Sequence, residues 1–161
     1  MKILYLVRHA KSSWEFDVID HERPLNDRGL KEAPIVAAHI ASKMEKPNLL
    51  LSSDALRAKT TALFFAKAYN IPESEIVLNH KLYDFAGQDL VKEILECDNA
   101  LDCIMVFGHN NAMTNFVNVY GDKQIDNVAT AAFTAITFDI DKWSDLSLGK
   151  TVYTTSPKEL R

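Results

Sequence analysis

The sequence predicts an α/β fold with a mostly parallel sheet, and three segments carry this prediction. Uninterrupted apolar runs occur at Ile3 to Val7, Leu49 to Leu51 and Cys103 to Phe107. Apolar runs without polar alternation are typical of strands that are buried on both faces. A polar turn and a segment with helical spacing follow the second and third runs. This order of strand, turn and helix is typical of parallel sheets.

Helices are expected between these strands. Apolar residues recur at helical spacing from Leu30 to Met44, after side chains in Leu25 to Gly29 that can cap a helix. Pro34 lacks an N–H and fits only the first turn of a helix. We therefore expect a short turn near residues 27–32 and a regular helix from about Ala33. Further helices are predicted at Ala55 to Tyr69, Asp89 to Cys97, and from Asn110 or Asn111 to Tyr120.

The remaining strands are shorter or lie at the end of the chain. Glu75 to Leu78 is predicted to be a third short strand, and Ala132 to Ile140 and Thr151 to Thr155 are predicted as two more. No long helix separates these last two, so we expect them to be antiparallel to each other.

Composition indicates a single domain, residues 1–161. The chain has 161 residues, of which 47% are hydrophobic, and no linker rich in Pro, Gly or Ser divides it. The net charge of −4 leaves no basic excess of the kind on which nucleic-acid binding depends. We therefore expect no nucleic-acid partner.

Targeting and metal-binding signals are not found. The first predicted strand follows Met1-Lys2 directly, and no apolar run approaches the roughly 18 residues of a membrane span. A cytoplasmic protein without membrane contact is expected. Cys97 and Cys103 match no disulfide framework or zinc signature. No metal and no cofactor are predicted.

Four residues at the ends of predicted strands form a candidate anion site: Arg8, His9, Arg57 and His109. Arg8 and His9 end the first strand, His109 follows the glycine after Phe107, and Arg57 lies in the first turn of a helix. Ligands of open α/β folds bind at the carboxyl edge of the sheet. Arginine donors match phosphate oxygens in pairs, and a histidine among them can accept a phosphoryl group. This chemistry requires no metal ion.

The same residues resemble motifs of the histidine phosphatase superfamily, also called phosphoglycerate mutase-like. Leu6-Val7-Arg8-His9-Ala10 resembles its Arg-His-Gly signature, with Ala10 in place of glycine. Ser52-Ser53, Arg57-Ala58 and Thr60-Thr61-Ala62 resemble the second-arginine motif, and Gly108-His109-Asn110 resembles the second-histidine motif. The SixA-like phosphohistidine phosphatase branch is indicated by further segments, Arg8 to Trp14, Arg23-Pro24-Leu25-Asn26 and Arg28-Gly29.

The resemblance implies a three-layer αβα sandwich around a central, mostly parallel sheet. It also implies that His9 is the nucleophile and is transiently phosphorylated, and that Arg8, Arg57 and His109 bind the phosphate. Spacing alone does not choose between the two histidines. Ser12 and Asn110 are further candidates for phosphate contacts, whereas Lys11 and Trp14 receive no assigned role.

Asp84 is the nearest candidate for the general acid that protonates the leaving group in larger branches of the family. A local turn-forming role for this loop carboxylate is the alternative. A weak acid favours phosphohistidine over alkyl phosphates, because imidazole leaves readily whereas an alkoxide needs a proton.

Three functions are therefore compared. The first is a metal-independent phosphatase that acts on phosphohistidine in a partner protein through a phosphorylated His9. The second is a phosphatase of small phosphate esters, and the third is a phosphate-recognition module without turnover. The presence of His9 disfavours the third, because binding alone would need only the arginines. The oligomeric state is not predicted.

Overall fold

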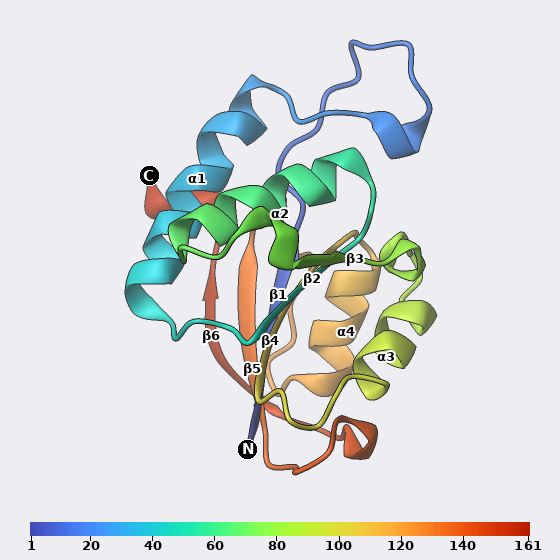
Figure 1. The fold of residues 1–161 in the computed structure, drawn as a ribbon, viewed down its shortest axis with the longest axis vertical. Helices are drawn as coiled ribbons and strands as arrows, with labels where there is room; N and C mark the ends of the chain where they lie inside the picture. Colours follow the sequence, from blue (N-terminus) through green and yellow to red (C-terminus); the bar gives the residue numbers. More distant parts are fainter.

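A computed structural model describes residues 1–161. A six-stranded sheet lies at its centre (Figure 1). Its strands are β1 (Lys2–Arg8), β2 (Leu49–Ser52), β3 (Ile76–Leu78), β4 (Cys103–Gly108), β5 (Phe133–Phe138) and β6 (Lys150–Thr155). The helices are α1 (Asp27–Lys43), α2 (Leu56–Ala68), α3 (Gln88–Leu95) and α4 (Ala112–Tyr120). Short 3₁₀ turns include η1 (Asp20–Glu22) and η3 (His80–Leu82).

The sheet is mostly parallel, as predicted. Its strand order is β3-β2-β4-β1-β5-β6. Strands β3, β2, β4 and β1 run parallel to one another, whereas β5 is antiparallel to both of its neighbours, β1 and β6. The expected antiparallel pairing of the last two strands is thereby confirmed.

Helices cover both faces of the sheet and complete the predicted three-layer sandwich (Figure 1). Helices α1 and α2 cover one face, and α3 and α4 cover the other. Alternate residues of β1 enter two separate cores: Tyr5 and Val7 pack on the α1–α2 side, and Leu4 and Leu6 pack on the opposite side. Burial on both faces explains why β1 reads as a continuous apolar run.

Helix α1 differs from the prediction. It is continuous from Asp27 to Lys43 and contains Pro34, so the expected start near Ala33 is wrong. The Asn26 side chain accepts a hydrogen bond from the Gly29 N–H and caps the helix seven residues earlier. Pro34 removes one backbone hydrogen bond. The buried face of α1, which includes Val36 and Ile40, compensates through packing against the core.

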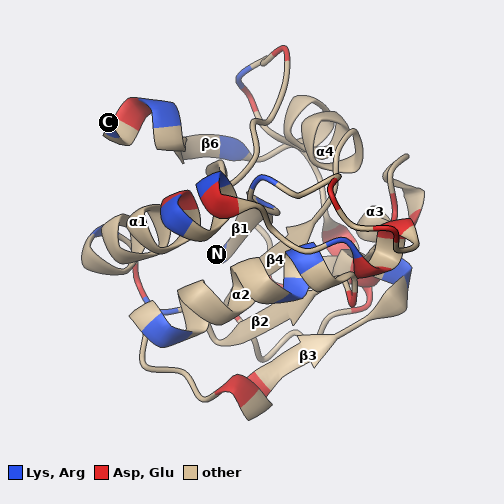
Figure 2. Ribbon diagram, turned by 90° about the horizontal axis from the view of Figure 1, so that it is seen from above, with Lys and Arg blue, Asp and Glu red and all other residues tan.

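Charges are distributed without a strong separation. Figure 2 looks from above, and in this view Lys and Arg segments are interspersed with Asp and Glu segments. No helix is both long enough and apolar enough to cross a lipid bilayer.

Candidate active site

The register of two central strands brings both predicted histidines to one point of the sheet edge. Arg8 at the end of β1 lies opposite Gly108 at the end of β4. His9 and His109 follow these residues, and their ring centroids lie 5.3 Å apart. Both side chains are buried. The parallel pairing therefore unites residues that are 100 positions apart in the sequence.

One cavity of about 250 Å³ at this edge is lined by all four predicted site residues, Arg8, His9, Arg57 and His109. Three arginines and one lysine contribute to its wall, against a single carboxylate, Asp20. The cavity is therefore electropositive and suited to an anion. The structure thus brings together the four residues that the sequence analysis selected.

His9 has a defined tautomer. Its Nδ1 lies 2.7 Å from the Ala10 carbonyl oxygen, which can only accept, so Nδ1 carries the hydrogen. Its Nε2 is 3.3 Å from Arg57 Nε, which can only donate. Nε2 is therefore unprotonated and its lone pair accepts from Arg57. An unprotonated nitrogen is the electronic state that a nucleophilic imidazole requires.

Burial keeps both histidines neutral. It lowers the pKa of His9 to about 3, with further lowering by the charges of Arg57 and Arg8, although the Ala10 hydrogen bond opposes this change. Burial likewise lowers the pKa of His109 to about 3, assisted by His9 and Arg57. The unprotonated form of each ring thus dominates at neutral pH.

Arg8 retains an unpaired donor. Its Nη1 donates to the Val128 carbonyl at 2.8 Å. Its Nε is buried and has no hydrogen-bond partner in the protein, which is costly unless a ligand supplies an acceptor. Burial, and secondarily the charge of Arg57, lowers the pKa of Arg8. An anionic ligand would supply an acceptor for Arg8 Nε and would favour the charged form of the guanidinium.

Arg57 is almost completely buried at the start of α2, with 2% of its surface exposed. Its two terminal nitrogens donate to Asp20, one to the carbonyl oxygen at 2.7 Å and the other to Oδ2 at 2.9 Å. Asp20 also accepts hydrogen bonds from Arg23 Nε and from the Tyr83 hydroxyl. Burial alone would raise the pKa of Asp20, but these three donors outweigh it and hold the pKa well below the usual range. Asp20 is therefore an anion already paired with Arg57.

Asp84 does not line the cavity. Its carboxylate accepts hydrogen bonds from the backbone N–H groups of Ala86, Gly87 and Leu90, at 3.0–3.1 Å. These contacts organise the turn before α3. They support the turn-forming alternative for Asp84 rather than a role as general acid.

Ser12 and Asn110 both line the cavity, but neither side chain is free. The Ser12 hydroxyl accepts a hydrogen bond from Arg23 Nη1 at 2.8 Å. Asn110 donates to Asn127 Oδ1 at 2.6 Å, and its own oxygen accepts from the N–H and hydroxyl of Thr114. Their phosphate contacts remain predictions, and their present contacts position the surrounding loops.

Several cavity residues were missed by the sequence analysis. They are Asp20, Arg23, Phe85 and Thr130. Lys11 and Trp14, which had no assigned role, also line the wall, and the Arg23 guanidinium stacks on the Trp14 ring at 3.5 Å. Arg23 belongs to the segment Arg23-Pro24-Leu25-Asn26 that resembles the SixA-like branch, and Asp20 precedes it by three residues. Neither observation reveals that this loop folds back over the site.

The two buried histidines are expected to make folding stability depend on pH. Their folded pKa of about 3 lies below the ordinary value of 6.5, so between these values the unfolded chain binds more protons and stability falls as pH falls. At pH 5 each histidine would lower the free energy of unfolding by up to about 2 kcal/mol. Urea unfolding at pH 7 and pH 5 measures this loss. In His109→Gln the decrease in unfolding free energy between pH 7 and pH 5 should be smaller by the contribution of one histidine. An unchanged decrease in that variant would refute the explanation.

The fold and cavity define a class of protein: an α/β domain whose parallel strands end at a cavity lined by arginines and imidazoles. The sequence model of the histidine phosphatase superfamily, branch 1, matches residues 4–89, just over half of the chain. The chain belongs to this superfamily.

Solved structures share this fold. A protein from Agrobacterium tumefaciens, provisionally assigned as the phosphohistidine phosphatase SixA, has a TM-score of 0.82 at 24% identity and covers 97% of this chain and 98% of its own. The protein histidine phosphatase SixA complexed with tungstate has a TM-score of 0.79 at 20% identity, covering 99% of both chains. These likenesses confirm a SixA-like, phosphoglycerate mutase-like fold.

Relatives are also found by sequence. An uncharacterised protein of Mycobacterium tuberculosis is 28% identical over 103 residues, which are 64% of this chain and 62% of that protein. A metal-independent phosphoserine phosphatase of Arabidopsis thaliana is 40% identical over 73 residues, covering 44% of this chain and 30% of that enzyme. The chain thus aligns with less than two thirds of the length of these relatives.

Proposed function

We propose that this protein is a phosphatase that needs no metal ion for catalysis and that removes the phosphoryl group from phosphohistidine in a partner protein. The observation that carries the proposal is the Nε2 lone pair of His9, which faces Arg57 in a cavity lined by cationic side chains. Family membership and the SixA-like fold support the same assignment.

In the first chemical step, His9 Nε2 attacks the phosphorus and the P–N bond of the substrate breaks. The Nδ1 hydrogen stays on the ring, because it is bonded to the Ala10 carbonyl. Arg8 and Arg57 stabilise the charge on the transferred oxygens, which is the main contribution a protein makes to phosphoryl transfer. In the second step water attacks phosphorus and the P–Nε2 bond breaks. Inorganic phosphate leaves with the hydrogens of that water, and His9 is restored.

Neither nearby carboxyl group is free to donate a proton to the leaving group, and this favours phosphohistidine as the substrate. Asp84 is bonded to backbone N–H groups, and Asp20 is ionised and paired with Arg57. A substrate imidazole that carries a hydrogen on its other nitrogen leaves as a neutral ring, so no proton transfer is needed. A serine alkoxide would need one. The exposed Trp14 ring on the cavity wall leaves a mouth that a protein side chain can approach.

The test compares inorganic phosphate release from a phosphohistidine-bearing protein, a phosphoserine peptide and an aryl phosphate, all in EDTA. We expect the highest kcat/KM for phosphohistidine. If the phosphoserine peptide is turned over equally well or better, the protein is instead a phosphatase of small phosphate esters. The 40% identity to a phosphoserine phosphatase over 73 residues favours this second function. If the folded protein releases phosphate from none of these substrates, the third function, phosphate recognition without turnover, is assigned instead.

A further inference from the structure

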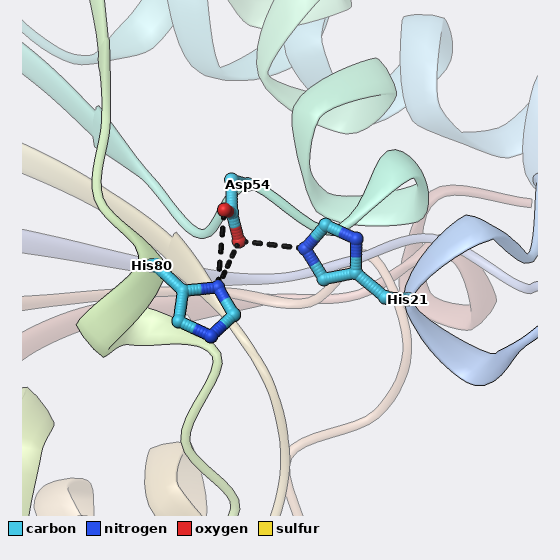
Figure 3. A group of neighbouring side chains, drawn as sticks. All are labelled: His21, Asp54 and His80. Atoms are coloured by element: carbon cyan, nitrogen blue, oxygen red, sulfur yellow. Dashed lines mark hydrogen bonds and ion pairs between the residues drawn. The ribbon is translucent and has the colours of Figure 1, made fainter.

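A second group of polar side chains lies beside the phosphate cavity without lining it. Figure 3 shows His21, Asp54 and His80 converging from three separate segments. His21 belongs to η1, Asp54 lies in the turn between β2 and α2, and His80 begins η3. None of the three is among the cavity residues, so this histidine–aspartate cluster is distinct from the site of the proposed chemistry.

The contacts within the cluster centre on Asp54. His21 Nε2 is 2.7 Å from Asp54 Oδ1, and His80 Nδ1 is 3.0 Å from Oδ1 and 3.1 Å from Oδ2. One carboxylate thus faces one nitrogen of each imidazole. The three ligand atoms, one from each residue, lie within 4.8 Å of one another.

This spacing is close to that of a metal site. A tetrahedral zinc ion about 2.0–2.2 Å from each ligand holds its ligand atoms roughly 3.4 Å apart. The contacts of Asp54 with His21 and His80 are somewhat shorter than that value, and no two of the ligand atoms are more than 4.8 Å apart. Side-chain movements of about an ångström would therefore complete the coordination. Such movements are open to these residues, because the side chains of His21, Asp54 and His80 are 30%, 31% and 72% exposed.

We infer that His21, Asp54 and His80 form a binding site for one divalent transition-metal ion of the zinc class. Two imidazoles and a carboxylate suit Zn²⁺, Co²⁺ or Ni²⁺, whereas Mg²⁺ and Ca²⁺ prefer all-oxygen sites. The solvent exposure of His80 leaves room for water as the fourth ligand. On binding, the metal replaces the hydrogen bonds to Asp54, and each neutral imidazole carries its hydrogen on the nitrogen that faces away from the metal.

Tyr83 connects this site to the phosphate cavity. Its ring packs edge-on against His21 with centroids 5.0 Å apart and lies 5.7 Å from His80. Its hydroxyl donates to Asp20, the neighbour of His21 in the chain. A bound metal would therefore brace η1, which carries Asp20, against the start of α2, which carries Arg57. Its role is structural and leaves the phosphoryl chemistry to His9.

The experiment uses the tag-free full-length protein, treated with EDTA and then freed of chelator. Titration with Co²⁺ is followed by its visible absorption, and Zn²⁺ affinity is obtained by competition. We expect one ion per chain in the wild type and at least tenfold weaker binding in His80→Ala. Zn²⁺ should also raise the melting temperature of the wild type but not of His80→Ala. Because His80 is largely exposed, this variant is expected to fold.

Two control variants locate the ion. His39→Ala removes a histidine of α1 whose Nε2 faces the Tyr153 hydroxyl rather than Asp54, and this variant should bind Co²⁺ like the wild type. His9→Asn tests the imidazoles of the phosphate cavity and should also retain binding. The inference is overturned if the folded wild type binds no Co²⁺, if His80→Ala binds normally, or if binding is lost in His9→Asn. These readouts do not depend on phosphatase activity, so they stand apart from the proposed function.

Discussion

Replacing His9 by asparagine is expected to lower phosphate release by a factor on the order of a thousand or more, because it removes the nucleophile from the proposed reaction. Asparagine is polar and of similar size, so the buried site should still fold. The same substitution should abolish covalent labelling of the protein by a ³²P-phosphohistidine substrate. Rapid acid-free quenching followed by gel autoradiography measures the label, and steady-state assays measure turnover.

A matched control for this experiment is His39→Asn, since His39 lies outside the cavity on α1. It should keep both turnover and labelling. Persistent labelling of His9→Asn would contradict the assignment of the nucleophile and would move the phosphoryl group to His109, the second imidazole of the pair.

Arg57→Lys is expected to reduce kcat/KM by roughly a hundred- to a thousandfold, the effect typical of losing a preorganised transition-state donor. The Arg57 guanidinium donates at once to His9 Nε2 and to two oxygens of Asp20. A lysine ammonium keeps the charge but not the planar set of donors. The variant would therefore orient His9 less well and bind the phosphoryl oxygens less tightly. Vanadate, an analogue of the phosphoryl group, should also bind more weakly to it.

The control for this variant is Arg28→Lys. Arg28 is largely exposed, lies outside the cavity and pairs with Glu32, whose side chain is mostly buried. Lysine keeps the positive charge, so the substitution should leave kcat/KM unchanged. Thermal unfolding of both variants separates loss of function from loss of fold. A change of less than threefold in folded Arg57→Lys would show that a point charge at this position is sufficient, contrary to the proposed use of the guanidinium.

Pro34 and Asp84 show where local sequence is insufficient, the first for the start of a helix and the second for a candidate general acid. Pro34 argued locally against an early helix, yet the buried face of α1 and the Asn26 cap outweigh one missing hydrogen bond. Asp84 was selected by its place between the second arginine and second histidine. Its three hydrogen bonds to backbone N–H groups depend on the turn that follows it, and a motif position does not reveal such contacts.

The sequence by itself determined the parallel sheet and the four residues at its edge. Apolar runs mark the buried strands, and each run ends abruptly in a polar motif, so Arg8, His9 and His109 can be placed from local pattern and the general geometry of parallel sheets. Only the tertiary structure decided the rest. Asp20 reaches Arg57 across 37 positions, and the tautomer of His9 depends on Arg57 as well as Ala10. Such contacts arise from long-range packing of a loop without periodicity, and local propensity carries no information about them.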